Sequence, residues 1–81
     1  GWATILFSAK AARWVADEHW HSRQQGRFLA DGRYELKVPY SVSRELLMDV
    51  LRHVPAVEVV APAELRAAFV GRLRAGLVGH E

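Results

Sequence analysis

A tight-turn signal, Asp31-Gly32, separates two strand-like segments near the middle of the chain. Arg27-Phe28-Leu29 precedes it, and residues 33–38 follow with alternating polar and apolar side chains. Because Asp and Gly tolerate the positive φ of a tight turn, this pattern predicts a β-hairpin. The other segments of the chain must then pack around this hairpin.

A strand and an amphipathic helix are predicted before the hairpin. Residues 3–7 are apolar and partly β-branched, which is typical of a buried strand. Ser8 is positioned to cap a helix over residues 9–20. His19 falls within the apolar arc of this helix, so we expect a partly buried side chain there. His21 is expected on the surface of a strand.

The second half of the chain repeats this alternation of helix and strand. Ser43 is a predicted N-cap of a helix that Pro55 ends, with its apolar and charged residues on opposite faces. Residues 57–60 have strong β propensity and form the fourth predicted strand. Pro62 suits the first position of a last helix.

The element order predicts an α+β fold, the ferredoxin-like split βαβ arrangement (β-α-β-β-α-β) with an additional C-terminal helix. We expect one domain over residues 1–81, with two helices on one face of a four-stranded antiparallel sheet. The side chains expected to face the helices are Ile5, Phe7, Phe28, Tyr34, Leu36, Val57 and Val59. Those expected on the other face are Thr4, Leu6, Arg27, Arg33, Glu35, Lys37 and Glu58. Since a slip of one residue inverts a strand, other pairings stay open.

The size of the chain limits what this fold can contain. With 81 residues, of which 51% are hydrophobic and 25% charged, it suffices for one globular domain. A domain this small buries roughly 60% of its unfolded surface, so a large cavity would compete with the core. These values favour a binding or assembly module over an enzyme.

The absence of cysteine excludes disulfides, thiolate metal sites and a cysteine nucleophile, and it fits a reducing, intracellular setting. No apolar segment approaches the roughly 20 residues of a membrane span, and no signal peptide is visible. Because the chain starts at Gly1 without Met, we expect a piece of a longer polypeptide.

Three segments together resemble a known family. They are Trp20-His21-Ser22-Arg23-Gln24, then Asp31-Gly32 with its alternating strand, and then residues 57–66, Val-Glu-Val-Val-Ala-Pro-Ala-Glu-Leu-Arg. This ordered set is similar to the C-terminal extension (WCX) of WYL-domain proteins, over essentially the whole chain. Two features depart from the family pattern. Val54 stands where Gly usually ends the second helix, and the tail, residues 78–81, lacks the usual Tyr.

The resemblance implies a C-terminal fragment of a bacterial, cytoplasmic transcriptional regulator. Such regulators carry an N-terminal winged helix-turn-helix and a central WYL domain, and nucleic acid or nucleotides are their known effector class. We therefore expect a regulatory and dimerisation module that forms a homodimer and transmits effector state to the upstream DNA-binding domain. It is not expected to bind operator DNA by itself, to act as an enzyme or to contact a membrane.

Basic residues provide a second hypothesis, a ligand-binding domain for a nucleotide, single-stranded nucleic acid or another anion. The net charge is only +2, with nine Arg and two Lys. Clustered cations on the hairpin would gain affinity for phosphates by releasing counterions. However, Glu35 and Glu58 dilute the charge, and no stacking aromatic is expected on that face. A solvated or subunit-facing surface is therefore the preferred interpretation. The candidate anion-binding residues are Arg23, Arg27, Arg33 and Lys37.

Large apolar side chains outside the predicted core are candidates for an interface. These are Trp2, Trp14, Trp20 and Met48. The alternative for Trp14 and Trp20 is that they cap the small core. For Arg66, a structural ion pair with Glu58 is the preferred expectation.

No metal site, cofactor or catalytic residue is predicted. His19 and His21 are two residues apart, while His53 and His80 are distant in sequence and no cysteine completes a site. The serines lie in cap or turn contexts, and there is no phosphate-binding glycine loop.

Overall fold

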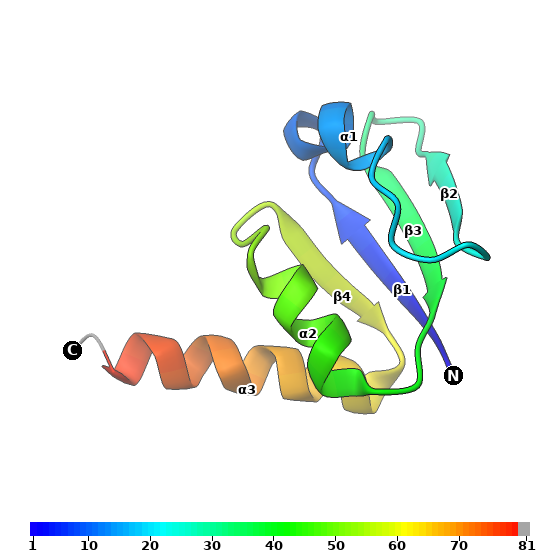
Figure 1. Ribbon diagram of the computed structural model, residues 1–81. Helices are drawn as coiled ribbons and strands as arrows, with labels where there is room; N and C mark the ends of the chain where they lie inside the picture. The colour runs from blue at the N-terminus through cyan, green and yellow to red at the C-terminus, as the bar shows by residue number, and fades with distance from the viewer. Residues whose placement is uncertain (80–81) are drawn as a thin grey trace.

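The computed structural model of the chain describes the backbone of residues 1–79 and the side chains of residues 1–76. Four strands and three helices follow one another in the predicted order (Figure 1). They are β1 (Trp2–Phe7), α1 (Ala9–Val15), β2 (Gln25–Phe28), β3 (Tyr34–Pro39), α2 (Ser43–Leu51), β4 (Val57–Ala61) and α3 (Ala63–Gly79).

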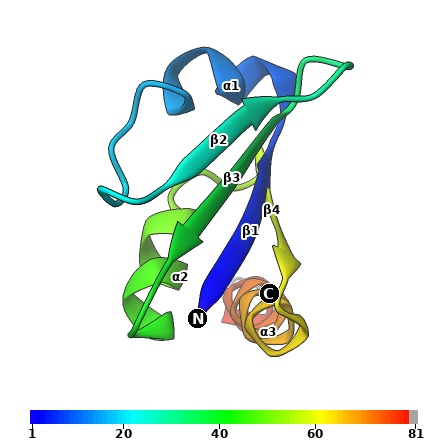
Figure 2. The same cartoon turned by 90° about the vertical axis from the view of Figure 1, so that its right-hand side faces the viewer.

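The strands form one antiparallel sheet in the order β2-β3-β1-β4. Helices α1 and α2 lie on the same face of this sheet (Figure 2). The ladder between β1 and β4 contains an irregularity between Thr4 and Ile5, whereas the β2–β3 register runs without a shift. The α+β fold class and the four-stranded antiparallel sheet are thus confirmed.

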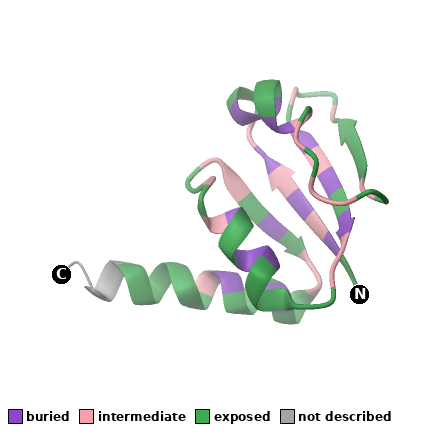
Figure 3. Ribbon diagram, viewed as in Figure 1, coloured by how far each residue is buried: buried purple, intermediate pink, exposed green. Residues whose placement is uncertain are grey.

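The core lies between the sheet and helices α1 and α2, and α3 adds Leu65 and Phe69 to it. Its largest fully buried side chains come from β1, β3 and β4 and from α1 and α2: Phe7, Ile5, Leu36, Val59, Val15 and Val50. Alternation along β1 and β3 buries every second residue, as the sequence pattern predicted (Figure 3). Phe28 is an exception. It lies opposite Tyr34, on the helix side, but is 61% exposed because no helix covers the edge strand β2.

Residues 29–33 connect β2 to β3 in the hairpin. The Leu29 amide donates to the Arg33 carbonyl at 2.7 Å, and the Gly32 amide donates to the Leu29 carbonyl at 3.0 Å. Gly32 has a φ of 91°, a left-handed conformation that glycine adopts without strain. The placement of Arg33 on the sheet was wrong, since β3 begins at Tyr34 and Arg33 belongs to the turn.

Helix α1 ends earlier than predicted. Ser8 caps it as expected, its Oγ accepting from the Ala11 amide at 3.2 Å, but the last helical residue is Val15. The backbone beyond it bonds to the Gln24 side chain, which accepts from the amides of Trp20 and His21. His19 therefore lies in a loop and is exposed, which corrects its predicted burial. His21 also lies in this loop and not on a strand.

Helix α2 begins one residue earlier than expected. Val42 occupies the N-cap position without a side-chain hydrogen bond, and Ser43 is the first helical residue. The predicted cap at Ser43 was therefore wrong. Leu46, Leu47 and Val50 are buried on one face, as the apolar spacing indicated.

Helix α3 runs away from the sheet, so that only its first half touches the rest of the molecule (Figure 1). Leu65 and Phe69 are buried, whereas Leu73 is 37% exposed and residues 71–76 all lie at the surface. Pro62 directly precedes the helix, and its carbonyl accepts from the Arg66 amide at 3.0 Å. Among the described residues, no helix has the length and apolar character to cross a membrane.

Candidate interaction surfaces

The face of the sheet opposite α1 and α2 is open. Strand alternation places on it the residues that we call the outer sheet face: Trp2, Thr4, Leu6, Arg27, Glu35, Lys37, Glu58 and Val60. Trp2 and Val60 are each 43% exposed, so this face combines apolar side chains with charges of both signs. Sequence reasoning did not place Trp2 here, because it began the strand at Ala3.

Two ion pairs neutralise part of this surface. Arg27 Nε lies 3.0 Å from Glu35 Oε1 on the neighbouring strand. Arg66 Nη1 lies 2.6 Å from Glu58 Oε2 and also donates to the Val59 carbonyl at 2.8 Å, which confirms the expected pair. The Arg66–Glu58 pair is about half exposed on both sides and Arg27 is 70% exposed, so each pair contributes about 0–1 kcal/mol to stability. Lys37 has no carboxylate within ion-pair distance in the described part of the chain.

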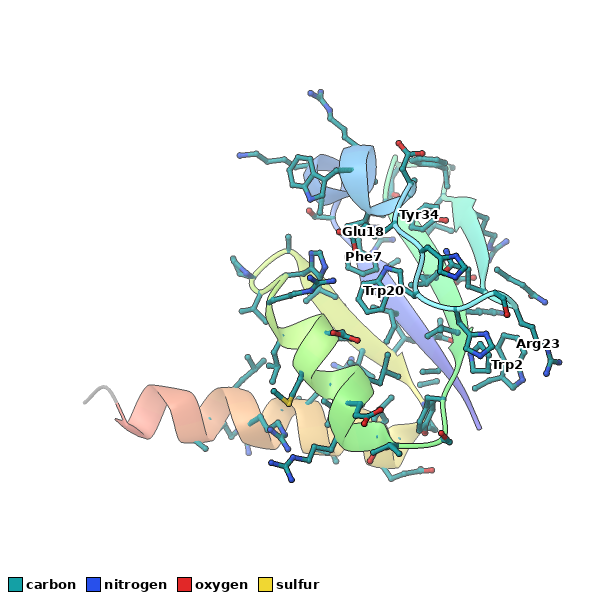
Figure 4. The ribbon with its side chains drawn as sticks, viewed as in Figure 1. Trp2, Phe7, Glu18, Trp20, Arg23 and Tyr34 are labelled. Atoms are coloured by element: carbon teal, nitrogen blue, oxygen red, sulfur yellow. The ribbon has the colours of Figure 1, made fainter. Side chains whose placement is uncertain are left out.

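The four predicted anion-binding residues do not form one cluster. Arg27 and Lys37 line a shallow hollow of about 410 Å³ on the outer sheet face, with Glu35 between them. Arg33 pairs instead with Asp31 in the turn, at 2.7 Å. Arg23 lies in the loop between α1 and β2, its guanidinium 5.7 Å from the centre of a Trp2 ring (Figure 4). The cations are therefore divided among three places.

Asp31 and Arg33 form a charged pair within the turn between β2 and β3. The Arg33 amide donates to Asp31 Oδ1 at 3.1 Å, and this hydrogen bond lowers the pKa of Asp31 below its ordinary value of 3.8. The Arg33 guanidinium adds to the effect. Asp31 thus holds Arg33 in the turn as an ionised carboxylate.

A groove of about 520 Å³ opens at the end of the sheet where β1 begins. Its walls come from the start of β1, the α1–β2 loop, the end of β3 and the start of α2. They include Trp2, Trp20 and Tyr40 together with Arg23 and Glu45. Sequence reasoning missed this groove, because nothing in the residue pattern shows that the loop returns to β1.

Trp20 packs onto the core. Its ring lies 6.0 Å from that of Phe7 and 5.7 Å from that of His53, measured between centroids. His53 meets Phe7 edge-on at 5.4 Å, and its Nε2 lies 3.6 Å from Glu18 Oε2. Trp20 is half-buried. Its packing favours the expectation that it caps the core over the expectation that it is an exposed interface residue.

The other three candidate contact residues are exposed but lie apart. Trp14 on α1 is 53% exposed, Met48 on α2 is 58% exposed, and Trp2 on β1 is 43% exposed. Helices α1 and α2 lie at opposite ends of the sheet (Figure 1). These side chains therefore do not form a single apolar patch.

The histidines lie at separate positions, and His80 lies outside the described residues. Within residues 1–76, no group of three or more His, Asp or Glu side chains is placed to hold a metal ion.

Comparison with known families gives one match. The model of the WCX domain matches residues 1–77, which is nearly the whole chain. No curated protein matches the sequence. The match covers all four strands and all of α3 except its last two residues. We conclude that the chain belongs to the WCX domain family.

Proposed function

We propose that this chain is an assembly and regulatory module of a WYL-type transcriptional regulator. In this proposal it associates with a second copy of itself. It also transmits the state of an upstream effector-sensing domain to an upstream winged helix-turn-helix, which would make the DNA contacts. Membership of the WCX family supports the association with WYL-type regulators.

The open sheet face is the structural observation that carries the proposal. It lies opposite both α1 and α2 (Figure 2). Strand register places Leu6, Val60 and Trp2 on it among paired charges. Mixed apolar and ion-paired surfaces of this kind are typical of non-obligate protein interfaces. The hollows on the described surface, including the groove beside Trp2, are open to solvent, which suits contact with another protein better than catalysis.

Sedimentation velocity from low to high micromolar concentration tests the self-association. We expect the weight-average sedimentation coefficient to rise with concentration, since an interface on so small a domain gives reversible association. A single monomeric species over the whole range would remove self-association from the proposal. The same measurement on the regulator that contains this domain tests whether the domain contributes to its dimer.

A second candidate function is anion binding, and one observation favours it. Arg23 and Lys37 have no carboxylate partner among the described residues, and Arg23 lies over the ring of Trp2. A cation beside an exposed aromatic ring suits a base and its phosphate. Titration with short single-stranded DNA at low and moderate salt tests this function.

The variants separate specific from general charge effects. Arg23→Ala with Lys37→Ala should abolish binding, whereas Arg13→Ala on α1, which also removes an exposed cation, should leave it unchanged. An equal loss of DNA binding in the double variant and in Arg13→Ala would indicate a nonspecific charge effect and would count against this second function.

A further inference from the structure

The two edges of the sheet are protected unequally. At the β4 edge, α3 packs against the strand and Arg66 donates to the Val59 carbonyl. An irregularity in the β1–β4 ladder further distorts that side. In β2, by contrast, all four residues, Gln25–Phe28, are exposed, and the strand has neither a proline nor a bulge. Short length and the charge of Arg27 are the protection that this four-residue strand has. Without a proline, a bulge or a covering helix, its backbone groups are accessible for pairing with another strand.

The hydrogen-bond register shows which backbone groups of β2 are open. The Leu29 amide donates to the Arg33 carbonyl, so Leu29 faces β3. In an antiparallel ladder the orientation alternates, so Arg27 also faces β3 through its pair with Glu35. The amides and carbonyls of Gly26 and Phe28 therefore point away from the sheet. They offer two donors and two acceptors to an added antiparallel strand.

We propose that β2 pairs with β2 of a second copy, antiparallel and centred on Arg27, so that two sheets become one continuous sheet. This inference rests on the proposed self-association and places the contact at the β2 edge of the sheet, so that the outer sheet faces of the two copies would adjoin. In this register Gly26 lies opposite the partner's Phe28, and Phe28 lies opposite the partner's Gly26. Both pairs exchange backbone hydrogen bonds.

The side chains of β2 are self-complementary in this register. Phe28 is 61% exposed, and its ring meets that of Tyr34 edge-on at a centroid distance of 5.1 Å. Gly26 has no side chain, and the Tyr34 phenol fills the space beside it on the helix side. The partner's Phe28 would thus lie opposite a glycine, next to the Tyr34 ring, and would lose much of its exposure. Aromatic pairs across strands add to sheet stability.

Glu35 offsets the charge repulsion that this register would otherwise create. Centring on Arg27 brings two arginines opposite each other, which is unfavourable for free charges. Each arginine is, however, held by its own Glu35 at 3.0 Å. The pairing is therefore expected to tolerate Arg27 but to weaken when Glu35 is neutralised.

Cysteine cross-linking tests the register directly, because the chain has no cysteine of its own. Arg27→Cys places two thiols opposite each other in a pair without backbone hydrogen bonds, within the Cα distance that a disulfide spans. We expect a covalent dimer under mild oxidation. The matched control is Lys37→Cys, on the same face but one strand further from the edge, which should cross-link far less.

Two substitutions at one position test the backbone contacts. Phe28→Ala removes the ring and should weaken the dimer about tenfold or more. Phe28→Pro also removes an outward amide that makes no bond within the sheet, so the fold should persist while dimerisation is lost. Circular dichroism verifies the fold of both variants.

Two further variants test the charge balance and the specificity of the contact. Glu35→Gln should weaken association, and Trp14→Ala, at an exposed tryptophan on α1, should leave it unchanged.

The outcomes distinguish this inference from the proposed function. A dimer that survives Phe28→Pro, and in which Arg27→Cys cross-links no better than Lys37→Cys, would overturn the β2 contact and leave self-association standing. A chain that stays monomeric at every concentration would overturn both. Selective cross-linking through Arg27→Cys together with loss of the dimer in Phe28→Pro would support the register.

Discussion

The phenol ring of Tyr34 occupies the space beside Gly26 where any other residue would place its Cβ. A Cβ at that position would overlap Tyr34 Oη and approach two ring carbons. Tyr34 is only 6% exposed, so its ring has little room to move. The glycine thus fixes how β2 sits against β3, and the edge of the sheet depends on it.

Gly26→Ala should destabilise the domain by about 1–3 kcal/mol, because the Tyr34 ring must shift within a packed environment. Urea unfolding gives the change in free energy. The control is Gly71→Ala in α3, where a Cβ would meet no atom within 4 Å. That variant should be stabilised by about 0.5–1 kcal/mol, since alanine favours a helix interior. Equal effects of the two substitutions would refute the role of the Tyr34 contact.

Gln24→Ala should loosen the loop between α1 and β2. The side chain accepts from two backbone amides and donates to the Glu18 carbonyl at 3.0 Å, and these groups would lose their partner. We expect a loss of about 1–3 kcal/mol and a red shift of tryptophan fluorescence as Trp20 becomes more exposed. Gln25→Ala, at an exposed neighbouring residue, is the control. An unchanged emission spectrum in Gln24→Ala would contradict this account.

Ser8→Ala should cost about 1 kcal/mol, because the Oγ caps α1 through the Ala11 amide. Ser43→Ala should change stability by only a few tenths of a kcal/mol on the same scale, since no side-chain hydrogen bond caps α2. Urea unfolding of the two variants side by side measures the difference. A larger effect at Ser43 than at Ser8 would reverse the assignment of the caps.

Asp31 should make stability depend on pH in the acid range. Its pKa in the folded chain is lowered, chiefly by the hydrogen bond from the Arg33 amide. The stabilisation is therefore fully present above the ordinary pKa of 3.8 and is lost as the pH falls through the lower folded value. Asp31→Asn should be less stable than the wild type at neutral pH, with a smaller difference in strong acid. A difference that stays constant with pH would rule out this origin.

Much of the fold could be predicted because local patterns and tertiary packing agree. Alternation in β3 and the Asp31-Gly32 signal identified the hairpin, and apolar spacing identified the buried face of α2. The end of α1 could not be predicted in this way. Residues beyond Val15 continue a helical pattern, but their backbone bonds to Gln24, a contact across the loop that periodicity does not reveal.

The candidate site was predicted less completely. The expected pair of Arg66 in α3 with Glu58 in the preceding strand β4 is confirmed. The four hairpin cations were expected to lie together. Arg33 instead pairs with Asp31, a carboxylate close to it within the turn. Exposure of Phe28 depends on the edge position of β2, and strand order is a property of the whole sheet that no local pattern contains.

Helix α3 has a mechanical consequence. Its last core contact is Phe69, and it continues to Gly79, about 15 Å further along at 1.5 Å per residue. A rigid helix held at one end acts as a lever, so a tilt of about 5° at Phe69 would displace the far end by about 1.3 Å. Small changes in packing between α2 and α3 would therefore displace the far end of α3 by a distance comparable to an atomic radius.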